Sequence, residues 1–250
     1  SGDAMVRSLL GLVYGAAVAD ARLALDDPAS KHLDEWRDDA RGAITIRQLL
    51  QNLSGLEGIA PGSAPLAADA GALARAAAFV RIAADRNTRL AFGTDFAAAA
   101  MSFPLAHEPG GRFAFSAANS QLLGVILERA TGTPFERYVE QRLWAPLGAG
   151  SGEFYMDRAN GMPAVYCCFR ASPRDWLRLG ALLADDGRAN GGAVLPRGWV
   201  AQMARGTSTV NPRYGLQVWS GRATRGTREY IPGSGRGVPH GEDLLQGLHP

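Results

Sequence analysis

The longest hydrophobic stretch of the sequence is near its beginning and has the length of a helix. Residues 5 to 20, MVRSLLGLVYGAAVAD, are apolar on most sides of a helical projection rather than along one stripe. A helix that is apolar all round is normally buried, so we predict a buried helix over residues 4 to 20. Gly11 and Gly15 are four residues apart and would let another element pack closely against one face of it.

Capping signals predict further helices along the chain. A Thr or Ser followed by a helix-favouring Pro or a reciprocal Gln, Glu or Asp is typical of a helix N-terminus. The helices predicted in this way begin at Thr45, Thr133 and Ser172 and end near Gly55, residue 144 and Gly187. A shorter helix is expected over residues 196 to 204, and Ser116 is expected to cap a helix that starts near Ala117.

The middle and the last part of the sequence are less regular. Residues 59 to 103 are rich in alanine, which favours helices over about 68 to 85 and 94 to 101. This stretch is predicted to be a variable helical insert or lid, or more simply a solvated helical pair. The alternating segment from Tyr214 to Ser220 predicts a strand, and residues 229 to 231 and 244 to 248 are weaker strand candidates.

Composition limits the possible functions. The 250 residues predict a single domain over 1–250, and a hydrophobic fraction of 46% is sufficient for a substantial core. The net charge of +2, with acidic and basic residues interspersed, gives no reason to expect nucleic acid as a partner. Neither a signal peptide nor a membrane span is recognised, and the compartment stays open.

Candidate metal and cofactor chemistry is sparse. Adjacent cysteines rarely bridge each other, so Cys167 and Cys168 are expected to be two small buried residues rather than a disulfide, redox or metal pair. The four histidines show no metal-binding spacing with each other or with these cysteines. The glycines at 233 to 237 predict a plain turn, because no helical pattern follows them. We therefore expect no metal and no cofactor.

Several segments, taken together and in order, resemble one protein family. The segments are residues 5–20, LALDDPASKHLDEW (23–36), ITIRQLLQNLSGL (44–56), the stretch from FAFSAANSQLLG to WAPLGA (113–149) and VYCCFRASPRDWLRLGALLADDG (165–187). They resemble the serine β-lactamase-like hydrolases, which include class C β-lactamases, esterases, D-aminopeptidases and 6-aminohexanoate-dimer hydrolases. The resemblance implies an α/β (α+β) fold that is rich in helices and has a central antiparallel sheet.

The resemblance also locates the catalytic positions of the family in this sequence. The family pattern Ser-x-x-Lys, which supplies nucleophile and base, corresponds to Ala4 and Arg7, and the tyrosine of its second motif corresponds to Phe115. Alanine has no nucleophilic atom, arginine stays protonated, and phenylalanine has no hydroxyl. All three replacements roughly keep the shape of the side chain while removing its reactivity. Lys31 is the only lysine, so Ser-x-x-Lys occurs nowhere in the chain.

The end of the sequence resembles the beginning of a third motif. Gly247 to Pro250 are similar to the His-x-Gly form of the strand that lines the family's site, which makes His249 a cleft candidate. Family members continue into further strands and also have strands before the first helix. The central sheet is therefore expected to be incomplete at both ends of this chain.

Three functional hypotheses follow. The first is a β-lactamase-like scaffold that is inactive or strongly impaired, with a cleft near Ala4, Arg7 and Phe115 in which Arg7 could bind a carboxylate. The ligand expected there is a small-molecule ester, amide or carboxylate. The second is an active hydrolase with an unidentified nucleophile. Ser116, with Asn119 nearby, is the cleft candidate for that role. The third is a helical interaction module completed by a partner chain, which would form an oligomer.

Overall fold

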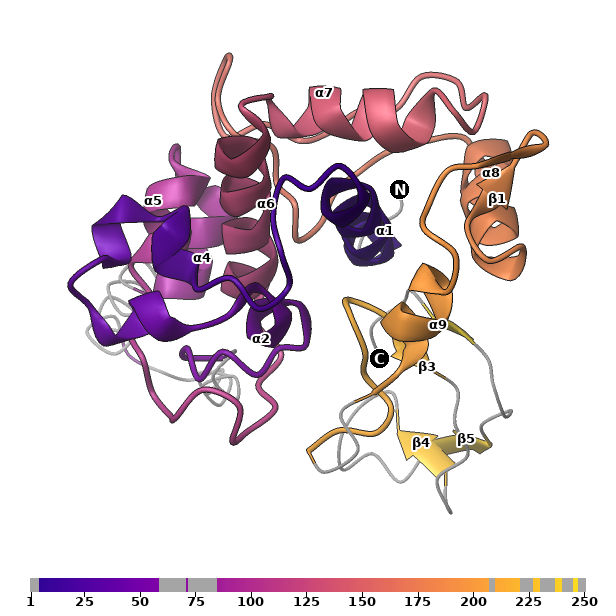
Figure 1. The fold of residues 1–250 in the computed structure, drawn as a ribbon. Helices are drawn as coiled ribbons and strands as arrows, with labels where there is room; N and C mark the ends of the chain where they lie inside the picture. The colour runs from indigo at the N-terminus through magenta and orange to yellow at the C-terminus, as the bar shows by residue number, and fades with distance from the viewer. Residues whose placement is uncertain are drawn as a thin grey trace.

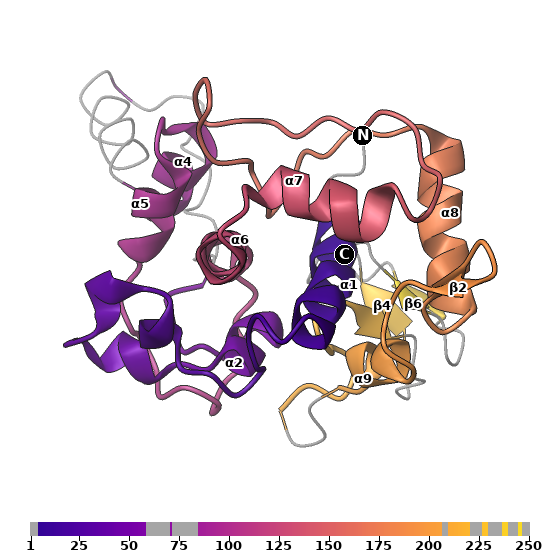
Figure 2. The ribbon, with the colours of Figure 1, turned by 45° about the horizontal axis from the view of Figure 1, so that its top comes forward.

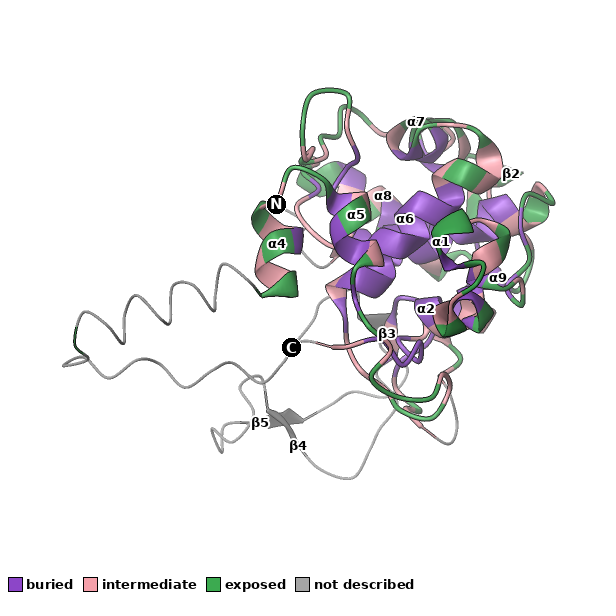
Figure 3. Cartoon of the chain, turned by 90° about the vertical axis from the view of Figure 1, so that its left-hand side faces the viewer, coloured by how far each residue is buried: buried purple, intermediate pink, exposed green. Residues whose placement is uncertain are grey.

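Two adjacent helices form the centre of the molecule. The computed structural model describes residues 5–58, 71, 85–206, 210–220, 227–229, 237–239 and 245–246. Helix α1 (Val6–Ala19) and helix α6 (Ala117–Thr131) lie in the middle, with α2, α4 and α5 beside α6 and with α8 and α9 beyond α1 (Figures 1 and 2). Burial colouring shows that both central helices are covered on nearly all sides (Figure 3).

Helix α1 confirms the predicted buried helix, and its glycines are sites of close approach. Every residue from Val6 to Ala17 is buried. A methyl group added at Gly15 would lie 2.5 Å from the indole Nε1 of Trp199, in α9 (Trp199–Ala204). The same indole nitrogen donates a hydrogen bond of 3.1 Å to the carbonyl of Gly11. Two glycines one turn apart therefore allow α9 to contact the backbone of α1.

Helix α6 connects the remaining helices to this core. It contacts α1, α2, α4, α5 and α7, and the Tyr14 hydroxyl of α1 donates a hydrogen bond of 2.7 Å to the Leu123 carbonyl within it. The other helices are α2 (Ile46–Leu50), α4 (Arg86–Phe92), α5 (Phe96–Met101), α7 (Phe135–Val139), a π-helical turn η5 (Glu140–Trp144) and α8 (Pro173–Ala184), with short 3-10 turns η2 (Ala29–Lys31), η3 (Asp34–Trp36) and η4 (Ala40–Ala43).

Two of the predicted helix starts are confirmed, and one is wrong in its detail. Thr45 and Gln48 form the reciprocal capping box, and the Ser172 side chain accepts the amide hydrogen of Asp175. Thr133 does not cap α7, which has Pro134 at its N-cap. The carboxylate of Glu128 accepts the first free amide, that of Phe135, at 3.3 Å. A side chain from the preceding helix therefore replaces the predicted local cap.

The boundaries of several predicted elements also change. Helix α2 ends at Leu50, well before Gly55, and α8 and α9 are shorter than expected, while the predicted 94–101 helix corresponds to α5. The predicted helix over 68 to 85 lies almost entirely outside the described residues. Within the described ranges, every helix is too short or too polar to cross a lipid bilayer.

The strands are short and antiparallel. Among the described residues they form three separate pairs: β1 (Arg188–Ala189) with β2 (Gly192–Ala193), β3 (Trp219–Ser220) with β6 (Leu245–Gln246), and β4 (Thr227–Glu229) with β5 (Gly237–Pro239). The strand expected from Tyr214 to Ser220 is reduced to β3 and a single bridge from Tyr214 to Trp219. Gln217 in this segment has a left-handed φ of 60°, which interrupts the extended backbone.

Candidate functional site

Arg7 and Phe115 lie against each other although they are far apart in sequence. Arg7 is in the first turn of α1, and Phe115 directly precedes Ser116, the N-cap residue of α6. The guanidinium carbon of Arg7 lies over the Phe115 ring, 4.1 Å from its centroid. This is the geometry of a cation–π contact, which is stronger when the cation is shielded from water. Ala4, the remaining position of the predicted site, lies outside the described residues.

The guanidinium of Arg7 is buried and is held by backbone carbonyls. Only 7% of the residue is exposed. Its Nε donates to the Tyr166 carbonyl at 3.3 Å and its Nη1 to the Ser116 carbonyl at 3.4 Å. Burial lowers the pKa of Arg7 from 12.5 to about 10, although the nearby Tyr214 and Tyr166 act in the opposite direction. Among the residues that the structure describes, no carboxylate forms an ion pair with Arg7.

Tyr214 belongs to the same site, which the sequence did not indicate. Its ring meets Phe115 edge-on at 6.1 Å between centroids, and it also contacts the ring of Trp219 at 4.8 Å. Burial raises the pKa of the Tyr214 hydroxyl well above its usual value, while Arg7 and Asn52 beside it act in the opposite direction. Neither motif spacing nor periodicity marks this residue, because only the fold brings it to Arg7.

Ser116 and Asn119 are buried and take part in a hydrogen-bond network that positions the start of α6. The Ser116 amide and the Asn119 Nδ2 both donate to Asn52 Oδ1, at 3.2 and 2.9 Å. Asn119 Oδ1 in turn accepts from the Ser54 hydroxyl at 2.7 Å. The predicted side-chain cap by Ser116 is wrong, since its hydroxyl makes no cap bond and instead points at the Glu57 carbonyl at 3.5 Å.

Two further side chains that carry a hydroxyl or an imidazole, those of Ser8 and His107, make no hydrogen bond to Arg7 among the described residues. Ser8 is 4% exposed and its hydroxyl is buried without a hydrogen-bond partner. His107 lies at the surface beside Arg112, with 3.0 Å between Nε2 and Nη1. His249 and Ser1 lie outside the described residues. Across the described ranges, no three histidine, cysteine or acidic side chains gather in a way that could hold a metal ion.

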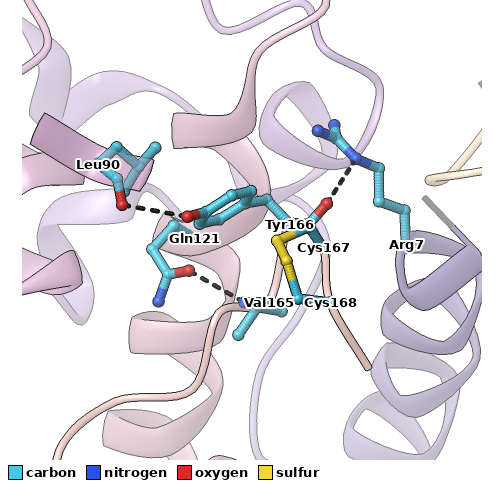
Figure 4. Close-up of a disulfide and its surroundings, with 7 residues drawn as sticks. All are labelled: Arg7, Leu90, Gln121, Val165, Tyr166, Cys167 and Cys168. Carbon is cyan, nitrogen blue, oxygen red and sulfur yellow. Dashed lines mark hydrogen bonds between the residues drawn. A yellow bond between two sulfur atoms is a disulfide. The ribbon is translucent and has the colours of Figure 1, made fainter. Parts of the chain in front are cut away.

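The two cysteines contradict the expectation that they are separate and buried. Cys167 and Cys168 form a disulfide between adjacent residues, and both are partly exposed. Cys168 also adopts a left-handed φ of 71°, which a side-chain-bearing residue rarely adopts. Figure 4 shows this disulfide next to Tyr166, whose carbonyl accepts the hydrogen bond from Arg7.

The arrangement is therefore a buried positive charge fixed by uncharged neighbours among the described residues. It combines a buried permanent cation, an aromatic ring in place of a phenol and carbonyl acceptors that fix the cation. Within the described residues, the groups in contact with Arg7 include no amine, imidazole or carboxylate that could act as a general base.

The comparison with known proteins decides which family this arrangement comes from. A family model described as beta-lactamase matches residues 6–241. This chain belongs to the beta-lactamase family. Arg7 and Phe115 lie within the matched range, and Ala4 precedes it. The predicted fold class and the predicted family resemblance are thereby confirmed.

Individual relatives of this beta-lactamase family member match over shorter segments. The 6-aminohexanoate-dimer hydrolase of Paenarthrobacter ureafaciens is 32% identical over 98 residues, which cover 39% of this chain and 25% of that protein. Protein flp of Staphylococcus aureus strain N315 is 29% identical over 144 residues, which cover 56% of this chain and again 25% of the relative. The matched segments thus span about a quarter of the length of these curated relatives.

Solved structures support the fold. A penicillin-binding protein from Bacillus halodurans superimposes with a TM-score of 0.62 at 17% identity, covering 87% of this chain and 69% of that one. The octameric penicillin-binding protein homologue from Pyrococcus abyssi gives a TM-score of 0.56 at 17% identity, covering 86% and 52%. At these identities the likeness concerns the fold alone.

Proposed function

We propose that this beta-lactamase family member is a scaffold without efficient acyl-transfer chemistry that binds a small carboxylate-bearing ester or amide. The observation that carries the proposal is the contact between Arg7 and Phe115. These are the two positions at which the family resemblance predicts a lysine base and a tyrosine, and they lie 4.1 Å apart. Their side chains meet, and neither carries a group that accepts a proton at neutral pH.

The chemical argument for lost activity concerns three positions. Acyl transfer by a serine needs a nucleophile and a base within hydrogen-bond reach. Ala4 supplies a methyl group, and Phe115 supplies a ring without an oxygen. Arg7 keeps its proton at neutral pH even though burial lowers its pKa to about 10. Proton transfer from an attacking hydroxyl therefore has no acceptor at this position.

The argument for binding rests on the buried charge of Arg7. Taking a guanidinium out of water is costly unless an anion or several strong acceptors replace the water. Arg7 has two carbonyl acceptors at the long distances of 3.3 and 3.4 Å, the Phe115 ring and the neighbouring Tyr214 side chain, and no ion-pair partner among the described residues. A ligand carboxylate would offset this cost through short, charge-assisted hydrogen bonds. The 6-aminohexanoate dimer and benzylpenicillin both combine an amide with a carboxylate and are suitable probes.

Restoring the three positions tests the proposed loss of chemistry. The variant carrying Ala4→Ser, Arg7→Lys and Phe115→Tyr is compared with the unmodified protein for hydrolysis of nitrocefin and a p-nitrophenyl ester. We expect the unmodified protein to remain at the background rate and the restored variant to gain at least about a thousandfold, the scale on which catalytic groups act together. Turnover by the unmodified protein at the restored rate would overturn the proposal.

Calorimetric titration with the two carboxylate probes tests binding. Reversible binding is expected in the unmodified protein. Arg7→Met should weaken it by about 30-fold or more, because removing one partner of a buried charge pair costs about 2 kcal/mol or more. Arg22→Met, at an exposed arginine outside the site, is the matched control and should bind normally. Equal affinity of all three proteins would refute a role for Arg7.

Covalent labelling separates this proposal from an active hydrolase. Ser116 is fully buried and its hydroxyl is directed at the Glu57 carbonyl, which disfavours it as a nucleophile. A fluorophosphonate or penicillin adduct detected by mass, and absent from Ser116→Ala, would establish the active alternative in its place.

Assembly into an oligomer is a second, compatible proposal. It is favoured by the octameric homologue from Pyrococcus abyssi, which shares the fold. Sedimentation velocity on the full chain should then show a species larger than one chain over a tenfold range of concentrations. A single species with the mass of one chain would refute it.

A further inference from the structure

The disulfide between Cys167 and Cys168 is open to small molecules on one side. Both cysteines are partly exposed. Cys168 lines a hollow with a volume of about 440 Å³, together with Phe92, Tyr155 and Arg170. The hollow is itself accessible, since Phe92 is 84% and Tyr155 is 56% exposed. A small thiol can therefore reach the sulfur of Cys168 from this side.

The same disulfide contributes little to holding the chain together. A disulfide stabilises a fold mainly by closing a loop in the unfolded chain, and the effect grows with the length of the loop. Here the sequence separation is one residue, the smallest that is possible. Cys168 is moreover held at a φ of 71°, outside the regions that side-chain-bearing residues prefer. The bond therefore fixes a local backbone conformation and does not staple distant elements.

This local conformation lies beside the anchor of Arg7. Tyr166 precedes the disulfide, and its carbonyl accepts from Arg7 Nε at 3.3 Å while its hydroxyl donates to the Leu90 carbonyl at 3.1 Å. The amide of Val165 donates to Gln121 Oε1 at 3.0 Å. Residues 165 and 166 are thus tied to α1, α4 and α6 at once, as Figure 4 shows. Residue 167 therefore directly follows a segment that is hydrogen-bonded to three helices.

We propose that Cys167–Cys168 is a reversible thiol-exchange site whose opening loosens Tyr166 from Arg7. A dithiol is the chemical class of reagent that would open it. One thiolate of the reagent bonds to Cys168 Sγ, the bond between the two cysteines breaks, and Cys167 leaves as a thiolate. The second thiolate of the reagent then displaces Cys168. The reagent is oxidised to a cyclic disulfide, the protein is reduced to two thiols, and the two protons of the reagent pass to the cysteines.

Opening the bond releases Cys168 from its left-handed conformation. The peptide between the two cysteines can then rotate, because the ring that fixed it no longer exists. Tyr166 precedes this peptide by one residue, so the position of its carbonyl under Arg7 changes with it. The inference depends on the position of Arg7, but not on whether the site binds a carboxylate or has lost its chemistry.

Native-state alkylation tests the exchange site itself. The chain has only two cysteines, so the count of alkyl groups is unambiguous. The full protein is treated with iodoacetamide before and after incubation with dithiothreitol in the absence of denaturant. We expect no alkyl group before reduction and two afterwards, with reversal on oxidation. Two groups without reduction, or none until the protein is denatured, would overturn the proposal.

Hydrogen exchange tests the coupling to Arg7. On reduction, amides of residues 165 to 168 should exchange faster by up to about tenfold, the effect of losing one hydrogen bond. The double variant Cys167→Ser, Cys168→Ser should exchange at the reduced rate and be insensitive to dithiothreitol. Its melting temperature should stay close to that of the unmodified protein, which shows that folding is intact. Unchanged exchange on complete reduction would refute the coupling, and exchange that rises throughout the molecule would refute a local switch.

Discussion

Replacing Arg7 by lysine offers the most direct test of how this site treats a positive charge. Arg7 is 7% exposed, and burial lowers its pKa from 12.5 to about 10. That difference in pKa corresponds to a free energy of about 3 kcal/mol that disfavours the charged form of Arg7. An ammonium group is hydrated more strongly than a guanidinium, so the same surroundings should disfavour it at least as much.

The expected value for the introduced lysine follows from this comparison. An ordinary lysine has a pKa of about 10.4, and an equal depression brings it to about 8. A lysine with this pKa is partly neutral at physiological pH and can accept a proton. Arg7→Lys alone should therefore produce a base at this position, although Ala4 still provides no nucleophile.

Nuclear magnetic resonance on protein labelled with carbon-13 at the lysine ε-carbon measures this pKa. Lys31 is the only natural lysine, so the variant gives two signals and Lys31→Arg assigns them. A midpoint near 8 for the introduced lysine supports the argument. A midpoint at or above about 10 would show that the introduced side chain reaches water. The conclusion that position 7 is buried would then be wrong.

Three further predictions concern stability. Gly15→Ala should lower the free energy of unfolding by about 1–3 kcal/mol in chemical denaturation, because the methyl group meets a buried indole 2.5 Å away. In the matched change Gly180→Ala the added methyl group meets no atom within 4 Å, and the protein should be stabilised by up to about 1 kcal/mol. Equal effects of the two substitutions on the free energy of unfolding would refute the packing argument. Hydrogen bonds from Arg129 lower the pKa of Glu35 to about 2, which adds stability above pH 4.5 that is lost as the pH falls towards 2. The Glu35 side chain is 46% exposed, so Glu35→Gln should remove only about 0.5–1 kcal/mol of this acid dependence, and an unchanged pH profile would contradict it. Asn119→Ala removes one hydrogen bond each from the buried side chains of Ser54 and Asn52, and it should lower the free energy of unfolding by about 2–3 kcal/mol in thermal or urea unfolding. A loss below about 0.5 kcal/mol, the scale of a surface substitution, would show that this hydrogen-bond network does not stabilise the fold.

Elements governed by neighbouring residues were predictable from the sequence. The capping box at Thr45 and the cap at Ser172 form as expected, because each involves atoms three residues apart on one chain segment. The buried helix α1 was equally clear, because its own residues are apolar on most sides of a helical projection. Thr133 shows the limit of such local signals, because the carboxylate of Glu128, in another helix, accepts the amide hydrogen of Phe135 at this helix start.

The candidate site was predictable only in part. The family resemblance named Arg7 and Phe115, and the structure places them in contact. Tyr214 was missed because it is about two hundred residues away from Arg7 in the sequence, and only the folding of the chain brings the two side chains together. The disulfide was missed because adjacent cysteines are normally too constrained to bridge. Cys168 adopts a left-handed φ at this bond, and that backbone conformation has no signature in the residue types.

The sequence by itself determined the buried first helix, two of the helix caps and the family resemblance, because these depend on side-chain chemistry and on contacts a few residues apart. Only the tertiary structure decided that Arg7 is a buried cation stacked on an aromatic ring and held by the carbonyl beside a disulfide. Burial and hydrogen bonding to distant segments depend on how the whole chain packs, and no short stretch of residues encodes them alone.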